Sequence, residues 1–207
     1  MASAIIHLAV AKTLKKYLDI ESSRDYYLGT IAPDIAKQIG ENKRRSHFLV
    51  NSRDDIPNIE LFIEKYPNFK KTSFDLGYFI HLYTDKIWFS RFLPTIVAGN
   101  SLKLLDGTVI NTTPEEKQDL LYQDYTNLNV KLLDEYNMDL SLFYEDFIPP
   151  KTTIDEIPIE KLNILIDKMG LIIENSKESK PYSFDTYLIL DFIDKACQEI
   201  LEILAKY

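Results

Sequence analysis

One stretch, from Phe74 to Phe92, limits the possible folds most, because its apolar residues recur at helical spacing and cover nearly every side. A helix of this kind is normally buried in a protein core. His81 and Asp85 nevertheless lie within it, four residues apart and therefore on one face. An isolated buried carboxylate is costly, so we expect Asp85 to be paired or to bind a metal ion. Two ligands at this spacing are a familiar way for a helix to hold a metal.

The composition fits a helical globular domain. Of the 207 residues, 45% are hydrophobic and 27% are charged, and only 6 are glycine. Spacings near 3.6 residues dominate, so we predict an all-α fold: one domain over residues 1–207, built as a bundle of about seven helices. Within it we expect a metal-site half over residues 1–92 and a helical scaffold half over residues 113–207.

The net charge of −8 argues against a sequence-independent grip on duplex nucleic acid, which depends on clustered Lys and Arg side chains. The single cysteine, Cys197, falls in an apolar pattern and is expected to be a small buried hydrophobe without a disulfide. Residues 1–7 lack the features of a signal peptide, and no run approaches the ~20 apolar residues of a membrane span. We therefore expect a soluble, cytoplasmic protein without a transmembrane segment.

The first predicted helix covers residues 3–18, and its apolar stripe places His7 on the inward face. Further along, Pro33 should kink or interrupt a helix, because proline has no amide hydrogen and its ring meets the carbonyl four residues back. Asp34 follows directly, and it could either help to start the next turn or point a carboxylate into a cavity. The other predicted helices cover residues 24–36, 55–66, 72–92, 113–137, 158–175 and 184–206.

Loops separate several of these helices. The loop over residues 40–55 is expected to dip into the core at His47, because three apolar residues follow it. The basic run just before His47 is most simply a solvated charge cluster, although it could also meet an anionic substrate. Residues 95–112 contain two glycine turns and indicate a loop with a small hairpin. Residues 139–150 are aromatic and acidic, and they could form a lid or a packed turn.

The three histidines of the chain, His7, His47 and His81, all sit in apolar settings that should turn inward, and Asp34 and Asp85 accompany them. A lone inward histidine is more often a hydrogen-bonded core residue than a ligand. Three histidines and two aspartates within the first 85 residues are harder to explain as separate core residues. Imidazole nitrogens and carboxylate oxygens suit Zn²⁺, and also Mn²⁺ or Fe²⁺. We therefore predict a metal site.

These pieces resemble the zinc-dependent phospholipase C and P1-type nuclease family, which is all-helical. The resemblance spans residues 4 to 89 and rests on four pieces: His7, Gly29–Asp34, Ser46–Phe48 and Gly77–Asp85. The ligands that it implies for one zinc ion are Asp34, His47, His81 and Asp85. It further implies that His7 joins Asp85, as a bridging carboxylate, on a second ion.

The chain also departs from the secreted members of that family. Those enzymes hold a third zinc ion partly through later histidines, and no histidine follows His81 here. They also use the amino group of an N-terminal tryptophan, whereas this sequence begins Met1-Ala2-Ser3. The ligand set of the second ion is thus incomplete, and water or another acid would have to complete it. Asp124, which precedes a helical apolar run, is the candidate additional ligand.

The reaction follows from the metal, because a bound ion lowers the pKa of a water molecule to ~7 and makes it a nucleophile. We predict a zinc-dependent hydrolase, with one or two ions, that acts on a small phosphoester. It would be a phospholipase C-like phosphodiesterase or a phosphomonoesterase. Asp34 is expected to be a ligand or to orient the water as general base. Arg44 or Arg45 is expected to clamp the substrate phosphate.

Two alternatives compete with this prediction. HD-domain phosphohydrolases are also helical and also use His and Asp, but their signature has the two residues adjacent. Here His47 precedes Phe48 and His81 precedes Leu82, which disfavours that family. The other alternative is a catalytically degenerate, metal-stabilised helical protein that binds a ligand or a partner. The absence of histidine ligands for a third zinc ion favours this second alternative modestly.

Overall fold

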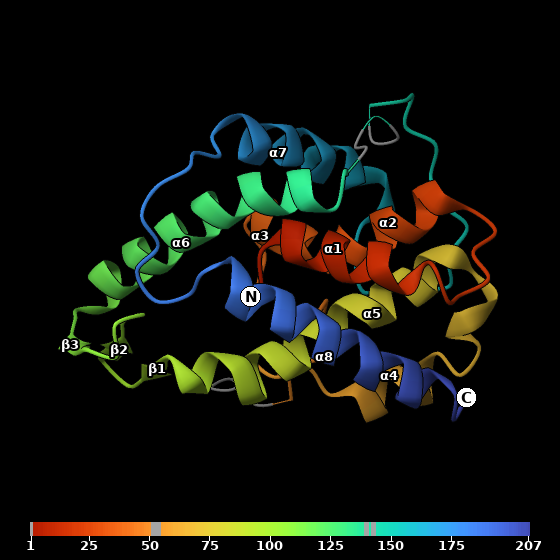
Figure 1. Ribbon diagram of the computed structural model, residues 1–207. Coiled ribbons are helices and arrows are strands. Elements are labelled where there is room, and N and C mark those ends of the chain that lie inside the picture. The colour runs from red at the N-terminus through yellow and green to blue at the C-terminus, as the bar shows by residue number, and fades with distance from the viewer. Residues whose placement is uncertain (1, 51–54, 139–140, 142–143) are drawn as a thin grey trace.

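The computed structural model describes residues 2–50, 55–138, 141 and 144–207, and these are mostly α-helical, as the sequence predicts (Figure 1). The α-helices are α1 (Ala4–Leu14), α2 (Ser23–Ile31), α3 (Ile35–Gln38), α4 (Ile59–Lys65), α5 (Ser73–Ile87), α6 (Pro114–Glu135), α7 (Leu162–Glu174) and α8 (Thr186–Leu204). Seven of these contain seven or more residues, and α3 is a single turn. No helix in this part of the chain is long and apolar enough to cross a membrane.

Polar side chains at the helix starts explain several boundaries. Ser22 and Thr72 each accept a hydrogen bond from a backbone N–H in the first turn of α2 and α5. Thr113 and Glu116 form a reciprocal capping box at the start of α6, where the sequence predicts a helix start. Helix α4 begins later than the predicted residue 55, because the side chain of Asn58 provides its cap.

Helices α2 and α5 approach each other more closely than side chains would allow. A Cβ atom at Gly29 would lie 2.1 Å from the carbonyl oxygen of Phe74, and one at Gly77 would lie 2.2 Å from that of Tyr26. Only glycine therefore fits at these two positions. The contact brings the backbone of α2 against the helix that carries His81.

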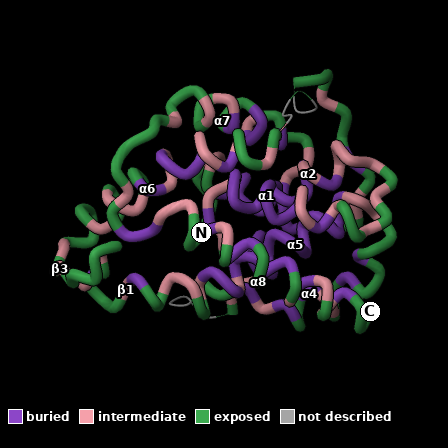
Figure 2. Tube along the Cα trace, viewed as in Figure 1, coloured by how far each residue is buried: buried purple, intermediate pink, exposed green. Residues whose placement is uncertain are grey.

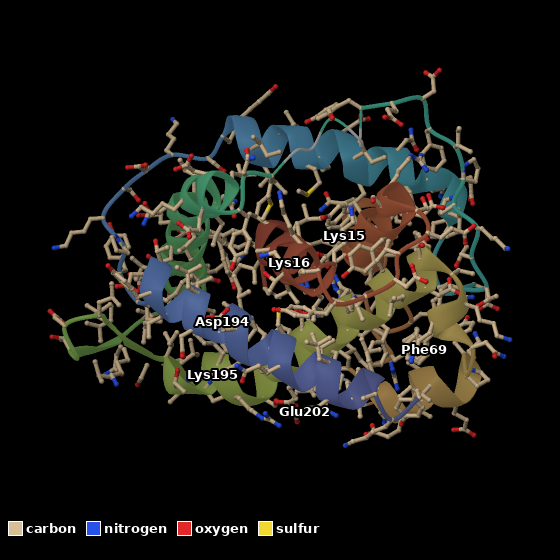
Figure 3. The ribbon with its side chains drawn as sticks, turned by 45° about the vertical axis from the view of Figure 1, so that its right-hand side comes forward. Lys15, Lys16, Phe69, Asp194, Lys195 and Glu202 are labelled. Atoms are coloured by element: carbon tan, nitrogen blue, oxygen red, sulfur yellow. The ribbon has the colours of Figure 1, made fainter. Side chains whose placement is uncertain are left out.

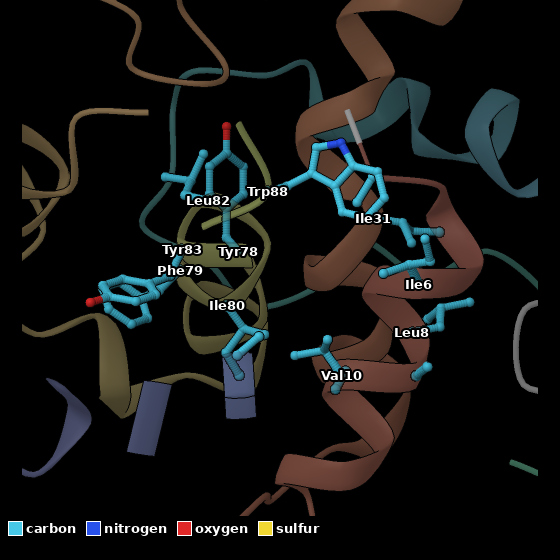
Figure 4. Close-up of a cluster of buried hydrophobic side chains, with 14 of the residues drawn as sticks. Ile6, Leu8, Val10, Ile31, Tyr78, Phe79, Ile80, Leu82, Tyr83 and Trp88 are labelled. Atoms are coloured by element: carbon cyan, nitrogen blue, oxygen red, sulfur yellow. The ribbon is translucent and has the colours of Figure 1, made fainter. Parts of the chain in front are cut away.

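Helix α5 is central to the core, and every residue from Phe74 to Asp85 is buried. Helices α1, α2, α4 and α8 pack against it, while α6 packs on α1 and α7 packs on α3. Figure 2 shows the buried residues concentrated around α1 and α5, and Figure 4 shows apolar side chains from these two helices in one cluster. The prediction that the stretch from Phe74 to Phe92 lies inside the core is confirmed as far as Trp88, whereas Ser90 and Arg91 are exposed.

Helix α8 adds the second half of the chain to the same core. Its charged residues Asp194, Lys195 and Glu202, labelled in Figure 3, are exposed on the outer face. Cys197 lies on the buried face, where its Sγ is 3.7 Å from the carbonyl oxygen of Val10. Burial raises the pKa of this thiol to about 12, so it stays protonated at neutral pH.

A short irregular region follows α5. The helix continues as a π-helical turn (Trp88–Phe92) and a 3-10 turn (Leu93–Thr95). A small antiparallel sheet comes next, with the strand order β1 (Val97–Ala98), β2 (Ser101–Lys103), β3 (Val109–Asn111). In its register, Leu102 of β2 faces Val97 on one side and Ile110 on the other. The hairpin expected within residues 95–112 is thus present. Of the expected lid or turn over residues 139–150, residues 139, 140, 142 and 143 lie outside the described part.

Candidate metal centre

The five residues predicted as metal ligands come together in the core although they come from separate segments. His7 is on α1, Asp34 follows α2, His47 lies in the loop after α3, and His81 and Asp85 are on α5. All five are buried. Their ligand atoms form two groups, in each of which all atoms lie within 4.8 Å of one another. The groups are His7 with His81 and Asp85, and Asp34 with His47 and His81.

Asp34 points inward from the short turn that contains Pro33. The predicted interruption after α2 is a short 3-10 turn (Ala32–Asp34) that contains this proline. Asp34 directly precedes α3, yet its side chain makes no capping hydrogen bond there. Its Oδ1 atom lies instead 3.4 Å from Nε2 of His47. Of the two alternatives that the sequence left open, the inward carboxylate is the one that the structure supports.

The distances between neighbouring ligand atoms suit groups that share one small cation. The Nε2 atoms of His47 and His81 are 3.2 Å apart, and Oδ1 of Asp34 lies 3.4 Å and 3.9 Å from them, respectively. Oδ2 of Asp85 lies 3.7 Å and 3.8 Å from the same two nitrogens. Ligands placed tetrahedrally at about 2.0–2.2 Å from zinc are roughly 3.3–3.6 Å apart, so the spacing fits this ion.

A backbone carbonyl determines the tautomer of His81. Nδ1 of His81 lies 2.8 Å from the carbonyl oxygen of Thr30, on the closely packed helix α2. A carbonyl oxygen can only accept a hydrogen bond, so Nδ1 carries the proton. Burial, and then the neighbouring His7, lower the pKa of His81 to about 3, which keeps the ring neutral. Nε2 of His81 therefore has no proton and presents a lone pair to the centre.

Ser46 contacts the ring of His47 in a similar way. Its hydroxyl lies 3.1 Å from the carbonyl oxygen of Lys43, to which it donates, and 2.9 Å from Nδ1 of His47. With its proton on the Lys43 carbonyl, the serine oxygen can accept a hydrogen bond from Nδ1–H of His47. In that tautomer the lone pair of Nε2 is directed at the centre, 3.2 Å from Nε2 of His81. A cation bound by both nitrogens would remove the repulsion between the two lone pairs.

Both carboxylates remain ionised in spite of their burial. Burial alone would raise the pKa of Asp34, but the imidazoles of His47 and His81 outweigh it and lower that pKa. For Asp85 the opposing effect comes first from His7, and its pKa is also lowered. Oδ1 of Asp34 and Oδ2 of Asp85 make no hydrogen bond with any described residue. Buried anionic oxygens without partners are costly, and a metal ion would remove that cost.

Asp85 turns its two oxygens toward different neighbours. Oδ2 faces His47 and His81, whereas Oδ1 lies 3.3 Å from Nε2 of His7 and accepts the backbone N–H of Ala2 at 3.1 Å. The ring of His7 stacks on that of His81 with the centroids 3.9 Å apart. Neither nitrogen of His7 makes a hydrogen bond with a described residue. This geometry suits a carboxylate that bridges two ions.

Asp124, the candidate additional ligand, is not part of either group. It lies on α6 and is fully buried. Its carboxylate accepts the backbone N–H groups of Tyr182, Ser183 and Phe184 at 2.7 to 3.3 Å. These bonds use the oxygens to fasten the segment before α8, so the expectation for Asp124 is not supported.

The two arginines expected to clamp a phosphate are engaged elsewhere. The guanidinium of Arg44 donates to the carbonyl oxygens of Leu49 and Val50, and that of Arg45 donates to the carbonyl oxygen of Asp155. Both arginines are exposed. In this conformation Arg44 holds the backbone that follows His47, and Arg45 connects this loop to the segment before α7.

Ser46 and Thr30 contact two of the candidate ligands, and the sequence assigned neither of them this role. Ser46 directly precedes His47, so its hydroxyl was a candidate partner by proximity alone. Thr30 acts through its carbonyl oxygen, which every residue has, and no sequence signal distinguishes it. Tyr78 of α5 adds another contact, because its hydroxyl donates to the carbonyl oxygen of Ser46.

Comparison with protein families matches residues 4–88 to the family described as zinc dependent phospholipase C. The matched stretch contains all five clustered residues, from His7 to Asp85. No curated protein and no solved structure matches the chain.

Proposed function

We propose that this chain, whose residues 4–88 belong to the zinc dependent phospholipase C family, is a metal-dependent hydrolase that cleaves a phosphoester. One observation carries the proposal: the Nε2 atoms of two buried imidazoles face two carboxylate oxygens that have no hydrogen-bond partner among the described residues. A cation would stabilise a buried group of this composition, and Zn²⁺ suits mixed nitrogen and oxygen ligands.

The residues divide between two ions. Asp34, His47, His81 and Asp85 would hold the first, and His7 with the other oxygen of Asp85 would contribute to a second. When bound, such an ion lowers the pKa of a water molecule to ~7 and polarises a phosphoryl oxygen. Mn²⁺ or Fe²⁺ would fit the same donors.

Asp34 is the residue best placed to meet the attacking water. Its side chain is 10% exposed, whereas those of the other four are at most 1% exposed. Its pKa is lowered, because the adjacent imidazoles outweigh the effect of burial, so it is ionised at neutral pH, as a metal ligand or a general base must be. We assign it the role of ligand or general base, and a small phosphoester would approach from its side.

Metal content is the first test. Protein purified without chelator should carry about one or two equivalents of zinc, manganese or iron per chain by elemental analysis. His81→Ala should lose most of this metal. A wild-type protein that holds no metal, even after it is added, would rule out the site.

Substrate class is the second test. The metal-loaded protein should hydrolyse a phosphodiester such as bis(p-nitrophenyl) phosphate, p-nitrophenyl phosphorylcholine, or the monoester p-nitrophenyl phosphate. Asp34→Asn should lower this activity, and its metal content separates the two roles: retained metal indicates a general base, lost metal indicates a ligand. Activity that survives undiminished in His81→Ala would contradict the proposed metal site as its source.

A second candidate function rests on the closed nature of the site. Four protein ligands around one zinc ion are typical of structural sites, whereas catalytic sites keep a position open for water. If Asp34 and the other three residues all bind at once, the protein would be a metal-stabilised scaffold. Metal would then raise the melting temperature, and none of the three substrates would be turned over.

A further inference from the structure

Phe48, the residue directly after His47, has an unusual backbone. Its φ is 54°, in the left-handed region that favours glycine. Among the described residues other than glycine, only Asn137 shares this property, with a φ of 42°. Asparagine adopts the conformation fairly often, but a bulky aromatic residue rarely does. Strain of this kind persists only where the surrounding structure compensates for it, and it is common at functional sites.

The strained residue ends the turn that carries His47. The N–H of Phe48 donates to the carbonyl oxygen of Arg45, and the N–H of Leu49 donates to that of Arg44. This pair of bonds is the Schellman arrangement, in which the left-handed position is usually glycine. His47 occupies the position just before it. The backbone of Phe48 therefore determines how the chain leaves the turn, and with it the direction of the His47 ring.

The side chain of Phe48 makes contacts that a glycine could not make. The ring of Phe48 packs edge-on against Phe62 of α4 and against Tyr66 at the end of that helix, with centroid distances of 5.3 Å and 6.3 Å. The carbonyl oxygen of Phe48 accepts the N–H of Asn58, the cap of α4. Phe62 is fully buried, so the ring is held by a rigid part of the core.

Helix α5 holds the same turn from its other side. Tyr78 donates its hydroxyl to the carbonyl oxygen of Ser46, and its ring stacks on Phe62 with centroids 6.0 Å apart. Phe62 thus contacts both Phe48 and Tyr78, the two residues that restrain the turn containing His47.

We propose that Phe48 is a positioning residue for His47. Its ring, fastened to α4, keeps the turn in the conformation that places Nε2 of His47 3.4 Å from Asp34 and 3.2 Å from His81. The inference rests on the proposed metal site, but it makes a separate claim, since it concerns the order of one imidazole in the metal-free protein. Residues that orient a metal ligand typically change metal affinity about 10- to 100-fold when they are lost.

The test uses Phe48→Gly, which suits the backbone and removes the ring. Asn137→Gly is the matched control, because it makes the same change at the other left-handed position, at the end of α6 and away from the site. Phe48→Leu keeps an apolar side chain at the strained position. It should give a smaller effect, and it serves if the glycine variant does not fold.

The first measurement is the imidazole ¹⁵N–¹H spectrum of the metal-free protein. Wild type and Asn137→Gly should each show one sharp set of signals for His47, with the proton on Nδ1. In Phe48→Gly the His47 signals should shift and broaden while those of His7 stay unchanged. Identical His47 signals in wild type and Phe48→Gly would overturn the proposal.

The second measurement is titration with Co²⁺, followed by its visible absorption. Phe48→Gly should bind about 10-fold more weakly and with an altered spectrum, and Asn137→Gly should match wild type. Equal Co²⁺ affinity and an equal spectrum in Phe48→Gly would also overturn the proposal. A wild type that binds no Co²⁺ would contradict the proposed function instead, and the imidazole spectra would still decide the role of Phe48.

Discussion

Two buried carboxylates, Asp124 on α6 and Asp85 on α5, differ in what surrounds them. Both side chains are inaccessible to solvent. Asp124 accepts three backbone N–H groups from residues 182–184. Asp85 has one backbone N–H on Oδ1, and its Oδ2 has no hydrogen-bond partner among the described residues and faces two imidazoles.

The difference separates a structural acid from a candidate ligand. Asp75 gives a second example of the structural kind, because it is buried and accepts hydrogen bonds from Thr152 and Thr153. A buried carboxylate with enough donors needs no cation. A buried carboxylate oxygen that lacks donors and faces imidazole nitrogens would be stabilised by a cation. Burial alone therefore does not identify a metal ligand; a buried carboxylate with an unpartnered oxygen beside imidazole nitrogens is the stronger candidate.

The largest expected effect comes from exchanging the two acids for amides. Asp85→Asn should lose nearly all bound metal, because both oxygens of Asp85 face candidate metal positions. Asp124→Asn should keep full metal content, while its free energy of unfolding falls by about 2 kcal/mol from one weakened set of hydrogen bonds. Elemental analysis and urea unfolding measure the two quantities. Equal metal loss in both variants would break the comparison.

Acid should lower the free energy of unfolding of the metal-free protein. The pKa of His81 is about 3 in the folded protein and about 6.5 unfolded, so the unfolded state binds more protons between these values. The free energy of unfolding should fall as the pH decreases from about 6.5 toward 3. The lowered pKa values of Asp34 and Asp85 act in the same direction at the acid end. The pKa of Asp124 is raised by burial, so its contribution has the opposite sign.

Urea unfolding of chelator-treated protein at pH 7, 5 and 4 measures this loss. His81→Phe should flatten the dependence, because it removes the buried imidazole. Unfolding free energies that stay constant from pH 7 to 4 in the wild type would contradict the neutral, buried state of His81.

A smaller effect is expected from Ser46→Ala, which removes the acceptor for Nδ1–H of His47. Metal affinity should fall about 10-fold, because the imidazole loses the contact that sets its tautomer. Ser183→Ala is the matched control, since Ser183 is also buried and its hydroxyl has no partner among the described residues. Competition with a chelator gives both affinities. Affinities that agree within twofold would show that Ser46 does not orient His47.

The smallest effect is expected from Arg45→Ala. Its guanidinium is exposed and bonds a backbone carbonyl, so the free energy of unfolding should change by no more than about 0.5 kcal/mol. Phosphoesterase activity should change less than about twofold if the arginine has no contact with substrate. A fall in kcat/KM of about 100-fold would instead restore the phosphate clamp that the sequence predicts.

Much of the fold could be predicted because its signals are local. The apolar stripe of α5, the break at Pro33 and the capping box at Thr113 each depend on residues within a few positions of one another. Asn58 could not be chosen over an upstream aspartate as the start of α4, because both are good caps and only packing distinguishes them.

The sequence by itself determined which side chains are available for a metal centre. It placed His81 and Asp85 on one face of a buried helix. It also indicated that His7, His47 and Asp34 face inward and could join them as ligands. The tertiary structure alone decided which polar atoms are left without partners. The carbonyl oxygen of Thr30 orients His81 across 51 positions of sequence, and the backbone N–H of Ala2 reaches Asp85 across 83. Periodicity reports the face of an element, whereas hydrogen-bond satisfaction depends on atoms that only the packed chain brings together.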